Sequence, residues 1–328
     1  MGRVNSGALL WVSVPGPELG PEDRRFLETI DPASVVIFRE NVHSPGQVRE
    51  LILAIRESCP SGQVLIAVDQ EGGRVARLRE GVPVLPPMRT LGKTGDPVRI
   101  REAGRELGRA LRELGFDVDF APVLDVDSNP GNPVIGDRAF SSDPLAVGRL
   151  AMAFAEGLEA EGIIPCGKHF PGHGDTDLDS HLALPTVQVS REVLENRELV
   201  PFREAISAGI PMLMTAHVVY PAWDDLHPAT LSRAIVSDLL RERLGYGGLI
   251  LSDDLLMEAV ARNGVANASL SALGAGCDGL LVLRNKEAAL KVYETVDRKV
   301  REGWPPAIRA IEHREEWMRV NAHRWRGR

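Results

Sequence analysis

Short runs of apolar, often β-branched residues alternate with longer amphipathic stretches along the whole chain. The short runs predict eight strands, at residues 8–14, 35–38, 64–69, 118–122, 164–169, 212–217, 249–252 and 279–282. Most of these runs are apolar throughout and do not alternate with polar residues. Such strands are typical of a parallel sheet that is covered by helices.

The stretches between the strands predict eight helices, at residues 22–30, 45–58, 97–114, 144–161, 191–208, 232–244, 256–275 and 286–302. Apolar residues in them recur three and four positions apart, as Leu51, Ala54 and Ile55 do. Three helices begin with a residue type that caps N-termini. Ser44 and Asp96 each stand directly before a proline, and Ser232 stands at the start of the helix predicted at 232–244.

Eight strands in strict alternation with helices predict one α/β domain over residues 1–328, a (β/α)8 barrel of the TIM type. No internal repeat, low-complexity stretch or linker marks off an accessory domain. We expect the basic C-terminal segment, residues 309–328, to form a final helix on the outside of the barrel. The active site of such a barrel lies at the C-terminal ends of its strands.

The composition narrows the function classes. The chain has 38 Lys and Arg residues against 46 Asp and Glu residues, a net charge of −8, which argues against nucleic acid or an anionic membrane as partner. No run approaches the ~20 apolar residues that span a bilayer, and the N-terminus lacks a signal-peptide cleavage pattern. Three widely spaced cysteines, Cys59, Cys166 and Cys277, are expected to be reduced and buried. We therefore expect a cytoplasmic protein.

Charged and imidazole side chains follow five of the predicted strands, at the end where a barrel carries its site. They are Asp69; Asp125, Asp127 and Arg138; Lys168 and His169; His217; and Asp253 and Asp254. One acidic residue in a loop is usually only solvated, but five strands that end this way predict a shared site. Adjacent residues leaving a strand point in opposite directions, so the spacing does not select between Asp253 and Asp254.

The segment 168–185, KHFPGHGDTDLDSHLALP, carries the densest set of reactive side chains. Acidic residues at 175, 177 and 179 resemble the first ligands of a calcium loop. Ser180 and Thr186, however, stand where that loop requires Gly and Glu, which excludes calcium.

Two other kinds of chemistry fit this segment. Pro171 and Gly172 exclude a helix that would align His169 and His173 as zinc ligands, although a zinc site that adds His181 and His217 stays open.

Acid–base chemistry is the other possibility. Asp179 and His181 are two residues apart and can meet in a turn. A carboxylate beside an imidazole suits proton transfer near neutral pH.

Several segments together resemble the family 3 glycoside hydrolases, specifically the single-domain bacterial β-N-acetylhexosaminidases of the NagZ type. They are VDQEGGRVARL (68–78), NPVIGDRAF (132–140), KHFPGHGDTDLDSHLALP (168–185), TAHVVYP (215–221), PATLS (228–232) and LSDDLLM (251–257). KHFPGHGD followed by DSH is very specific, whereas DQEGGRV alone is only moderately so. The segments follow the order expected for the family.

The resemblance implies a retaining exo-β-N-acetylglucosaminidase that removes a terminal β-linked N-acetylglucosamine (GlcNAc) through a covalent glycosyl-enzyme, with no metal or other cofactor. Asp253 corresponds to the nucleophile, and His181, assisted by Asp179, to the general acid/base. Glycoside hydrolases more commonly use two carboxyl groups for these roles. The residues that match those holding the sugar are Asp69, Arg77, Arg138, Lys168 and His169.

By analogy with the family, we expect peptidoglycan fragments in cell-wall recycling as substrates and a monomeric enzyme. Four alternatives stay open: a β-N-acetylglucosaminide phosphorylase, a β-glucosidase of the same family, a metal-dependent hydrolase and a non-catalytic sugar-binding barrel. A phosphorylase is an alternative because a neutral histidine leaves less negative charge in the site than a glutamate, and so admits phosphate more readily. A non-catalytic barrel should have lost Asp253 or His181, and both are present.

Overall fold

An eight-stranded parallel barrel closes on itself in the computed structural model, which describes residues 5–177, 184–261 and 264–325. Its strands are β1 (Leu10–Ser13), β2 (Ser34–Ile37), β3 (Leu65–Val68), β6 (Val118–Asp119), β7 (Ile164–Phe170), β8 (Met212–Thr215), β11 (Leu249–Asp254) and β12 (Gly279–Leu281). Each strand pairs with the next in this order, and β12 pairs back with β1, where Trp11 lies beside Leu281. The predicted (β/α)8 barrel is confirmed.

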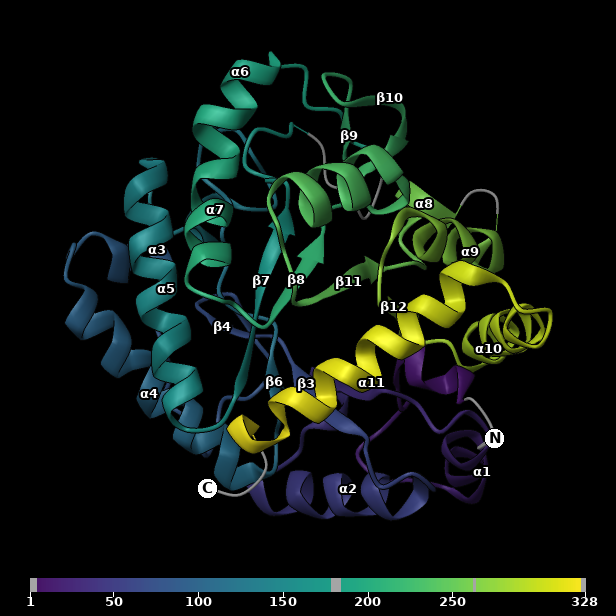
Figure 1. The fold of residues 1–328 in the computed structure, drawn as a ribbon. Helices are drawn as coiled ribbons and strands as arrows, with labels where there is room; N and C mark the ends of the chain where they lie inside the picture. The colour runs from purple at the N-terminus through teal and green to yellow at the C-terminus, as the bar shows by residue number, and fades with distance from the viewer. Residues whose placement is uncertain (1–4, 178–183, 262–263, 326–328) are drawn as a thin grey trace.

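Helices surround the barrel, as Figure 1 shows. They are α1 (Pro21–Ile30), α2 (Pro45–Ser58), α3 (Met88–Gly92), α4 (Pro97–Leu114), α5 (Pro144–Ala160), α6 (Arg191–Val193), α7 (Leu199–Ser207), α8 (Glu258–Ala261), α9 (Val265–Ala275), α10 (Lys286–Arg301) and α11 (Pro305–Trp325). Short 3₁₀ turns are η1 (Ser6–Leu9), η2 (Arg39–Asn41), η3 (Gly136–Arg138) and η5 (Ala229–Leu231). The predicted N-terminal caps of α2 and α4 form, because Ser44 accepts a hydrogen bond from the N–H of Gln47 and Asp96 from that of Val98.

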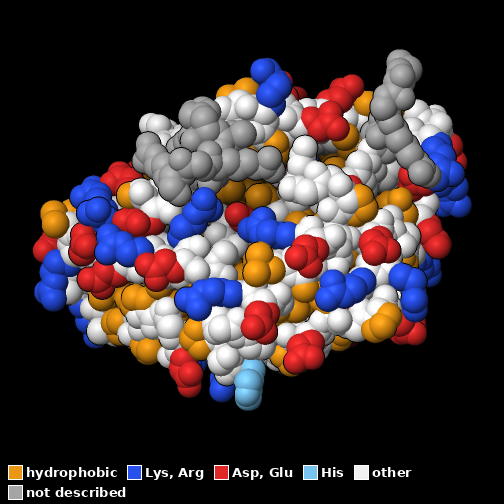
Figure 2. Space-filling model, turned by 90° about the horizontal axis from the view of Figure 1, so that it is seen from below, with side chains coloured by type: hydrophobic (Ala, Val, Ile, Leu, Met, Phe, Trp, Pro, Cys, Tyr) orange, Lys and Arg blue, Asp and Glu red, His pale blue; other side chains and the backbone are white. Residues whose placement is uncertain are grey.

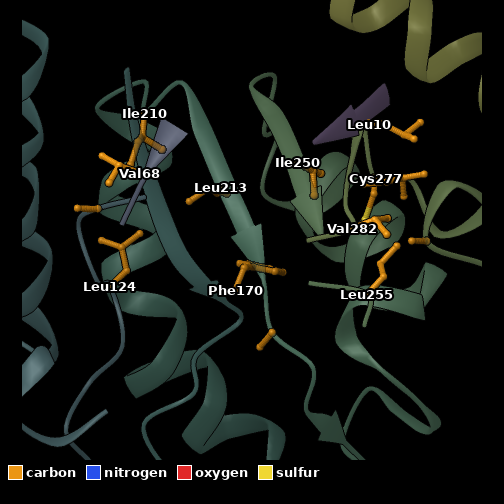
Figure 3. Close-up of a cluster of buried hydrophobic side chains, with 14 of the residues drawn as sticks. Leu10, Val68, Leu124, Phe170, Ile210, Leu213, Ile250, Leu255, Cys277 and Val282 are labelled. Atoms are coloured by element: carbon orange, nitrogen blue, oxygen red, sulfur yellow. The ribbon is translucent and has the colours of Figure 1, made fainter. Parts of the chain in front are cut away.

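Side chains along each strand alternate between two apolar cores. On β11, Leu249 and Leu251 belong to the cluster inside the barrel, whereas Ile250 packs outward against the helices. Figure 3 shows part of this outer layer, in which Val68, Leu213 and Ile250 come from three different strands. Because both faces of the sheet are buried, its strands are mostly apolar, and charged residues such as Lys168 and Asp253 come at their C-terminal ends.

Three predicted helices differ in detail from the observed ones. A π-helical segment, η4 (Leu194–Glu198), lies between α6 and α7, and the helix predicted at 232–244 is π-helical over η6 (Ala234–Arg243). The helix predicted at 256–275 is divided into α8 and α9, and Gly264 before α9 has a φ of 85°. Apolar spacing detects helical turns but not which carbonyl accepts each N–H, so it does not separate π from α.

Two short hairpins were not predicted. One joins β4 (Gln70–Gly72) to β5 (Val75–Ala76) directly after β3, and the other joins β9 (Val219–Tyr220) to β10 (Asp224–Pro228). Strands of two to five residues are too short to show a clear alternation of apolar and polar positions. The first hairpin extends β3 beyond the barrel on the side where the predicted site residues gather.

The C-terminal helix α11 lies across the N-terminal ends of the strands, where Figure 1 shows it crossing the barrel. Trp317 of this helix belongs to the cluster inside the barrel, and the His313 Nδ1 lies 2.9 Å from the Asp278 carboxylate just before β12. The final helix expected on the outside of the barrel forms and begins at Pro305. The Trp317 side chain of this helix closes the end of the barrel that is opposite the site.

The surface carries charges of both signs. Figure 2 shows Lys and Arg side chains intermixed with Asp and Glu side chains over the face that includes α2. Within the part of the chain that the structure describes, no helix is both long and apolar enough to cross a membrane.

Removing the Trp317 side chain should destabilise the whole barrel, because it fills the end of the inner core. We expect Trp317→Ala to lower the free energy of unfolding by about 3–5 kcal/mol in urea denaturation. The matched change Val320→Ala, on the same helix at a side chain that is 49% exposed, should stay within about 0.5 kcal/mol of wild type. Equal losses for both variants would show that α11 does not seal the core through Trp317.

Candidate active site

A cavity of about 220 Å³ lies at the C-terminal ends of the barrel strands. It is smaller than the ~300–1,000 Å³ typical of pockets for drug-sized ligands, which suits one small polar unit. Six of the predicted site residues line it: Asp69, Arg77, Arg138, Lys168, His169 and Asp253. The structure therefore brings together residues from positions 69 to 253 of the chain, as the barrel prediction requires.

A network of buried ion pairs forms one wall of this cavity. The ammonium of Lys168 lies 2.7 Å from a carboxylate oxygen of Asp69 and 2.7 Å from one of Glu71. Arg77 binds the other oxygen of Asp69 at 3.0 Å, and Arg138 binds both oxygens of Glu71 at 2.8 Å. The side chains of Lys168 and Glu71 are only 3% and 2% exposed. Each charge is thus compensated before any ligand enters.

Glu71 was missed by the sequence analysis although it completes this network. It stands two residues after Asp69, in the hairpin that follows β3. Extended residues two positions apart point to the same side of the chain, and this spacing is the signal that could have identified it.

The ion pairs hold these groups in their charged forms. Burial disfavours a charged carboxylate, but Lys168 and Arg77 outweigh it and lower the pKa of Asp69. In the same way Arg138 and Lys168 overcome burial and lower the pKa of Glu71 to about 2. Burial also opposes the charge of Lys168, yet Asp69 and Glu71 raise its pKa.

His169 is oriented by a fully buried carboxylate. Its Nδ1 lies 2.7 Å from the Asp125 Oδ2, and Asp125 Oδ1 accepts hydrogen bonds from the N–H groups of His169 and His173 at 3.2 and 2.7 Å. Burial opposes the charge of Asp125, but His169 lowers its pKa. His173 also lines the cavity; burial lowers its pKa to about 4, and its Nδ1 lies 2.9 Å from the Thr176 hydroxyl.

The two adjacent aspartates at the end of β11 have different surroundings. Asp254 uses one carboxyl oxygen to accept the N–H groups of Leu256 and Leu283, at 3.1 and 3.2 Å, and burial raises its pKa to about 7. The N–H of Asp254 donates to the Asp253 Oδ1 at 2.7 Å. Asp254 therefore stabilises the backbone at the end of β11. The strand spacing alone did not distinguish it from Asp253.

The remaining candidates from the strand ends have structural partners. His217 lies with Nδ1 2.8 Å from the Thr230 hydroxyl and Nε2 3.0 Å from the Asp254 carbonyl oxygen. Asp127 forms an ion pair with Arg89. Asp179 and His181 lie outside the described residues. Over the ranges 5–177, 184–261 and 264–325, no group of three His, Cys, Asp or Glu side chains could hold a metal ion.

Residues 5–314 match the glycosyl hydrolase family 3 N-terminal domain. The chain belongs to this family. It is 40% identical to a β-hexosaminidase of Tolumonas auensis over 97% of this chain and 95% of the relative, and 41% identical to a β-hexosaminidase of Thiobacillus denitrificans over 92% and 84%. The protein is a glycoside hydrolase of family 3, as the sequence resemblance predicted.

Solved structures agree with this assignment. A family 3 β-N-acetylglucosaminidase of Paenibacillus superposes with a TM-score of 0.93 at 37% identity over 98% of this chain, which spans 63% of that longer chain. NagZ of Neisseria gonorrhoeae, in complex with N-trifluoroacetyl-D-glucosamine, superposes with a TM-score of 0.80 at 33% identity over 95% of this chain and 93% of its own.

The lowered pKa of Glu71 predicts an acid-sensitive fold. Because the folded state favours its carboxylate, the stabilisation is fully present above its ordinary pKa of 4.5 and is lost as the pH falls towards about 2. Urea denaturation between pH 2 and pH 6 should show this decline, and Glu71→Gln should make it shallower. At neutral pH this variant should lose about 3–5 kcal/mol, because buried Arg138 loses its carboxylate partner and Lys168 loses one of its two.

The exposed pair of Arg101 and Glu156 supplies the control. Glu156→Gln should cost no more than about 1 kcal/mol and leave the pH dependence as in wild type. An unchanged acid profile in Glu71→Gln would show that this carboxylate is not the group that protonates.

Proposed function

We propose that the protein is a retaining β-N-acetylglucosaminidase that releases a terminal β-linked GlcNAc through a covalent intermediate on Asp253. The observation that carries this proposal is the placement of Asp253 in one cavity with Asp69, Arg138, Lys168 and His169. The polar wall offers fixed donors and acceptors for sugar hydroxyl and acetamido groups. The similar proteins are a β-hexosaminidase in two bacteria and a β-N-acetylglucosaminidase in a third, which supports GlcNAc as the sugar.

In the first step we propose that a carboxylate oxygen of Asp253 attacks the anomeric carbon. A carbon–oxygen ester bond forms while the bond to the leaving group breaks, and protonated His181 gives its proton to the departing oxygen. In the second step neutral His181 removes a proton from water, whose oxygen attacks the same carbon and releases Asp253. Asp179 is proposed to orient His181. An imidazole with an ordinary pKa of ~6.5 can serve in both forms near neutral pH.

We further propose that Asp69, Arg77, Arg138, Lys168 and His169 hold the sugar. Because the ion pairs fix these side chains in advance, binding requires little reorganisation of the protein.

The leaving group is proposed to lie near Arg284. Its guanidinium lies over the Phe38 ring, 4.0 Å from the centroid, and both residues line the active-site cavity. Arg284 also borders a second cavity of about 230 Å³. Arg284 already pairs with Glu40 at 2.8 Å, and its guanidinium has further N–H groups that can bind a second carboxylate. This supports acidic leaving groups such as the muramyl residue of peptidoglycan fragments. We therefore propose a role in cell-wall recycling for a monomeric, cytoplasmic enzyme.

Hydrolysis of an aryl β-N-acetylglucosaminide tests the proposed activity. The wild-type chain should cleave it, and Asp253→Ala should lose at least about a thousandfold in kcat/KM, because a covalent step without its nucleophile loses most of its acceleration. Urea denaturation of the variant should show that the fold is retained.

Three controls distinguish the alternatives. Preference for an aryl β-glucoside would contradict the acetamido-sugar assignment, and loss of activity with a chelator would indicate a metal-dependent hydrolase. Formation of a glycosyl phosphate when phosphate is added would identify a phosphorylase.

The role of His181 predicts a dependence on the leaving group. His181→Ala should slow substrates with poorly acidic leaving groups at least about a hundredfold more than substrates with activated aryl groups, which need little proton donation. Initial rates for a series of aryl substrates would measure this. An equal loss across the series would argue against His181 as the acid.

A further inference from the structure

Two buried polar side chains stand directly behind the proposed sugar-binding wall and do not line the cavity. Gln70 is 2% exposed and Asp119 is 0% exposed. Neither has a role in the proposed reaction. Both are joined by hydrogen bonds to the segment that carries Asp69 and Arg77, so each could determine where those two side chains lie.

The Gln70 side chain holds the two ends of the first hairpin together. Its Oε1 accepts hydrogen bonds from the N–H groups of Arg77 and Leu78, at 2.9 and 3.0 Å, and its Nε2 donates to the Leu78 carbonyl at 3.0 Å. The hairpin runs from Gln70 in β4 to Ala76 in β5, which pair with each other. The side-chain amide of Gln70, the residue directly after Asp69, therefore binds the backbone at Arg77 and Leu78.

Asp119 attaches this hairpin to the barrel. Its Oδ1 accepts the N–H of Gln70 at 2.9 Å, so the peptide group between Asp69 and Gln70 is held by the neighbouring strand β6. Within the part of the chain that the structure describes, Asp119 Oδ2 has no hydrogen-bond partner.

The neutral form of Asp119 suits this position. Burial raises its pKa to about 8, with repulsion from Asp69 and Glu71 acting in the same direction and Lys168 opposing them. At neutral pH the protonated carboxyl can accept the hydrogen bond without adding a third negative charge beside Asp69 and Glu71. Asparagine should therefore replace it well.

We propose that Gln70 and Asp119 are positioning residues that hold Asp69 and Arg77 in the geometry required for sugar binding. This inference rests on the proposed function, because it assumes that Asp69 and Arg77 contact the sugar. Asp69 lies between Lys168 at 2.7 Å and Arg77 at 3.0 Å, so a small shift of the hairpin would break one of these contacts. Misplacement of a binding group by about 1 Å can reduce catalysis ~100-fold.

Steady-state kinetics with an aryl β-N-acetylglucosaminide tests the proposal. Gln70→Met keeps the size of the side chain but loses its three hydrogen bonds, and Asp119→Leu removes the acceptor. Each should lower kcat/KM about 10- to 100-fold, mainly through a higher KM. Asp119→Asn, which keeps an acceptor oxygen, should stay within about twofold of wild type.

Asp117 provides a matched control at the opposite end of the same two strands. Its Oδ2 accepts the N–H of Ile66 at 2.8 Å and pairs with Arg56 at 2.7 Å, so it also joins the segment after α4 to β3. Asp117→Leu should lower the midpoint of urea unfolding yet leave KM within about twofold. If Asp119→Leu and Gln70→Met likewise change only stability, the positioning role is wrong.

A double-mutant cycle separates positioning from an independent effect. If Gln70 acts partly through Arg77, the double variant should lose less kcat/KM than the product of the fold-losses measured for Gln70→Met and Arg77→Met alone. Fully multiplied losses would contradict that coupling.

Hydrogen exchange of the backbone amides of residues 70–78 tests, without reference to activity, whether the Gln70 side chain holds the hairpin in place. Gln70→Met should speed exchange in this segment, and Asp117→Leu should leave it unchanged. If the wild-type chain cleaves no GlcNAc glycoside but exchange changes as expected, the proposed function is wrong, whereas the role of Gln70 in holding the hairpin is confirmed. Unchanged exchange in Gln70→Met would show that Gln70 does not hold the hairpin in place.

Discussion

The Lys168 ammonium, 2.7 Å from both Asp69 and Glu71, is the charge on which the arrangement of the barrel mouth depends. An uncompensated charge is very costly in a buried site, and two carboxylates without a cation would repel each other. Lys168 lets one strand, β7, hold together two acidic residues that follow β3. Arg77 and Arg138 pair with the same two carboxylates from the other side, so that three cations face two anions. The hairpin, the strand end and the 3₁₀ turn carrying Arg138 are thereby joined by electrostatic contacts.

This pairing of charges gives the polar wall of the site a fixed shape, and Phe38 and Phe120 add apolar surface to the cavity. Its polar atoms are bound to one another, so a sugar would meet acceptors and donors already held in place. The apolar barrel interior lies directly below, where Trp11 and Phe120 pack with their rings 5.7 Å apart. The barrel is therefore polar at the C-terminal ends of its strands and apolar below them.

Much of this arrangement could be predicted from the sequence, and what could not has physical reasons. Apolar runs revealed all eight strands because both sheet faces are buried, and strand ends identified Asp69, Lys168 and the pair of Asp253 and Asp254. The pattern did not reveal Gln70, whose importance depends on a hairpin too short to show periodicity. It also left Asp253 and Asp254 equivalent, since only the hydrogen bonds of Asp254 with the backbone distinguish them. The placement of the His181 segment lies outside the described residues.

The position of Trp317 has a consequence for how the chain acquires its structure during synthesis. The barrel ring closes only when β12 reaches β1, a separation of about 270 residues along the chain, and such distant pairings form slowly. Even then the inner core stays open at one end until residue 317 has left the ribosome. Nascent chains that stop short of α11 would expose apolar surface that the completed chain covers, and so would depend on chaperones until the last helix arrives.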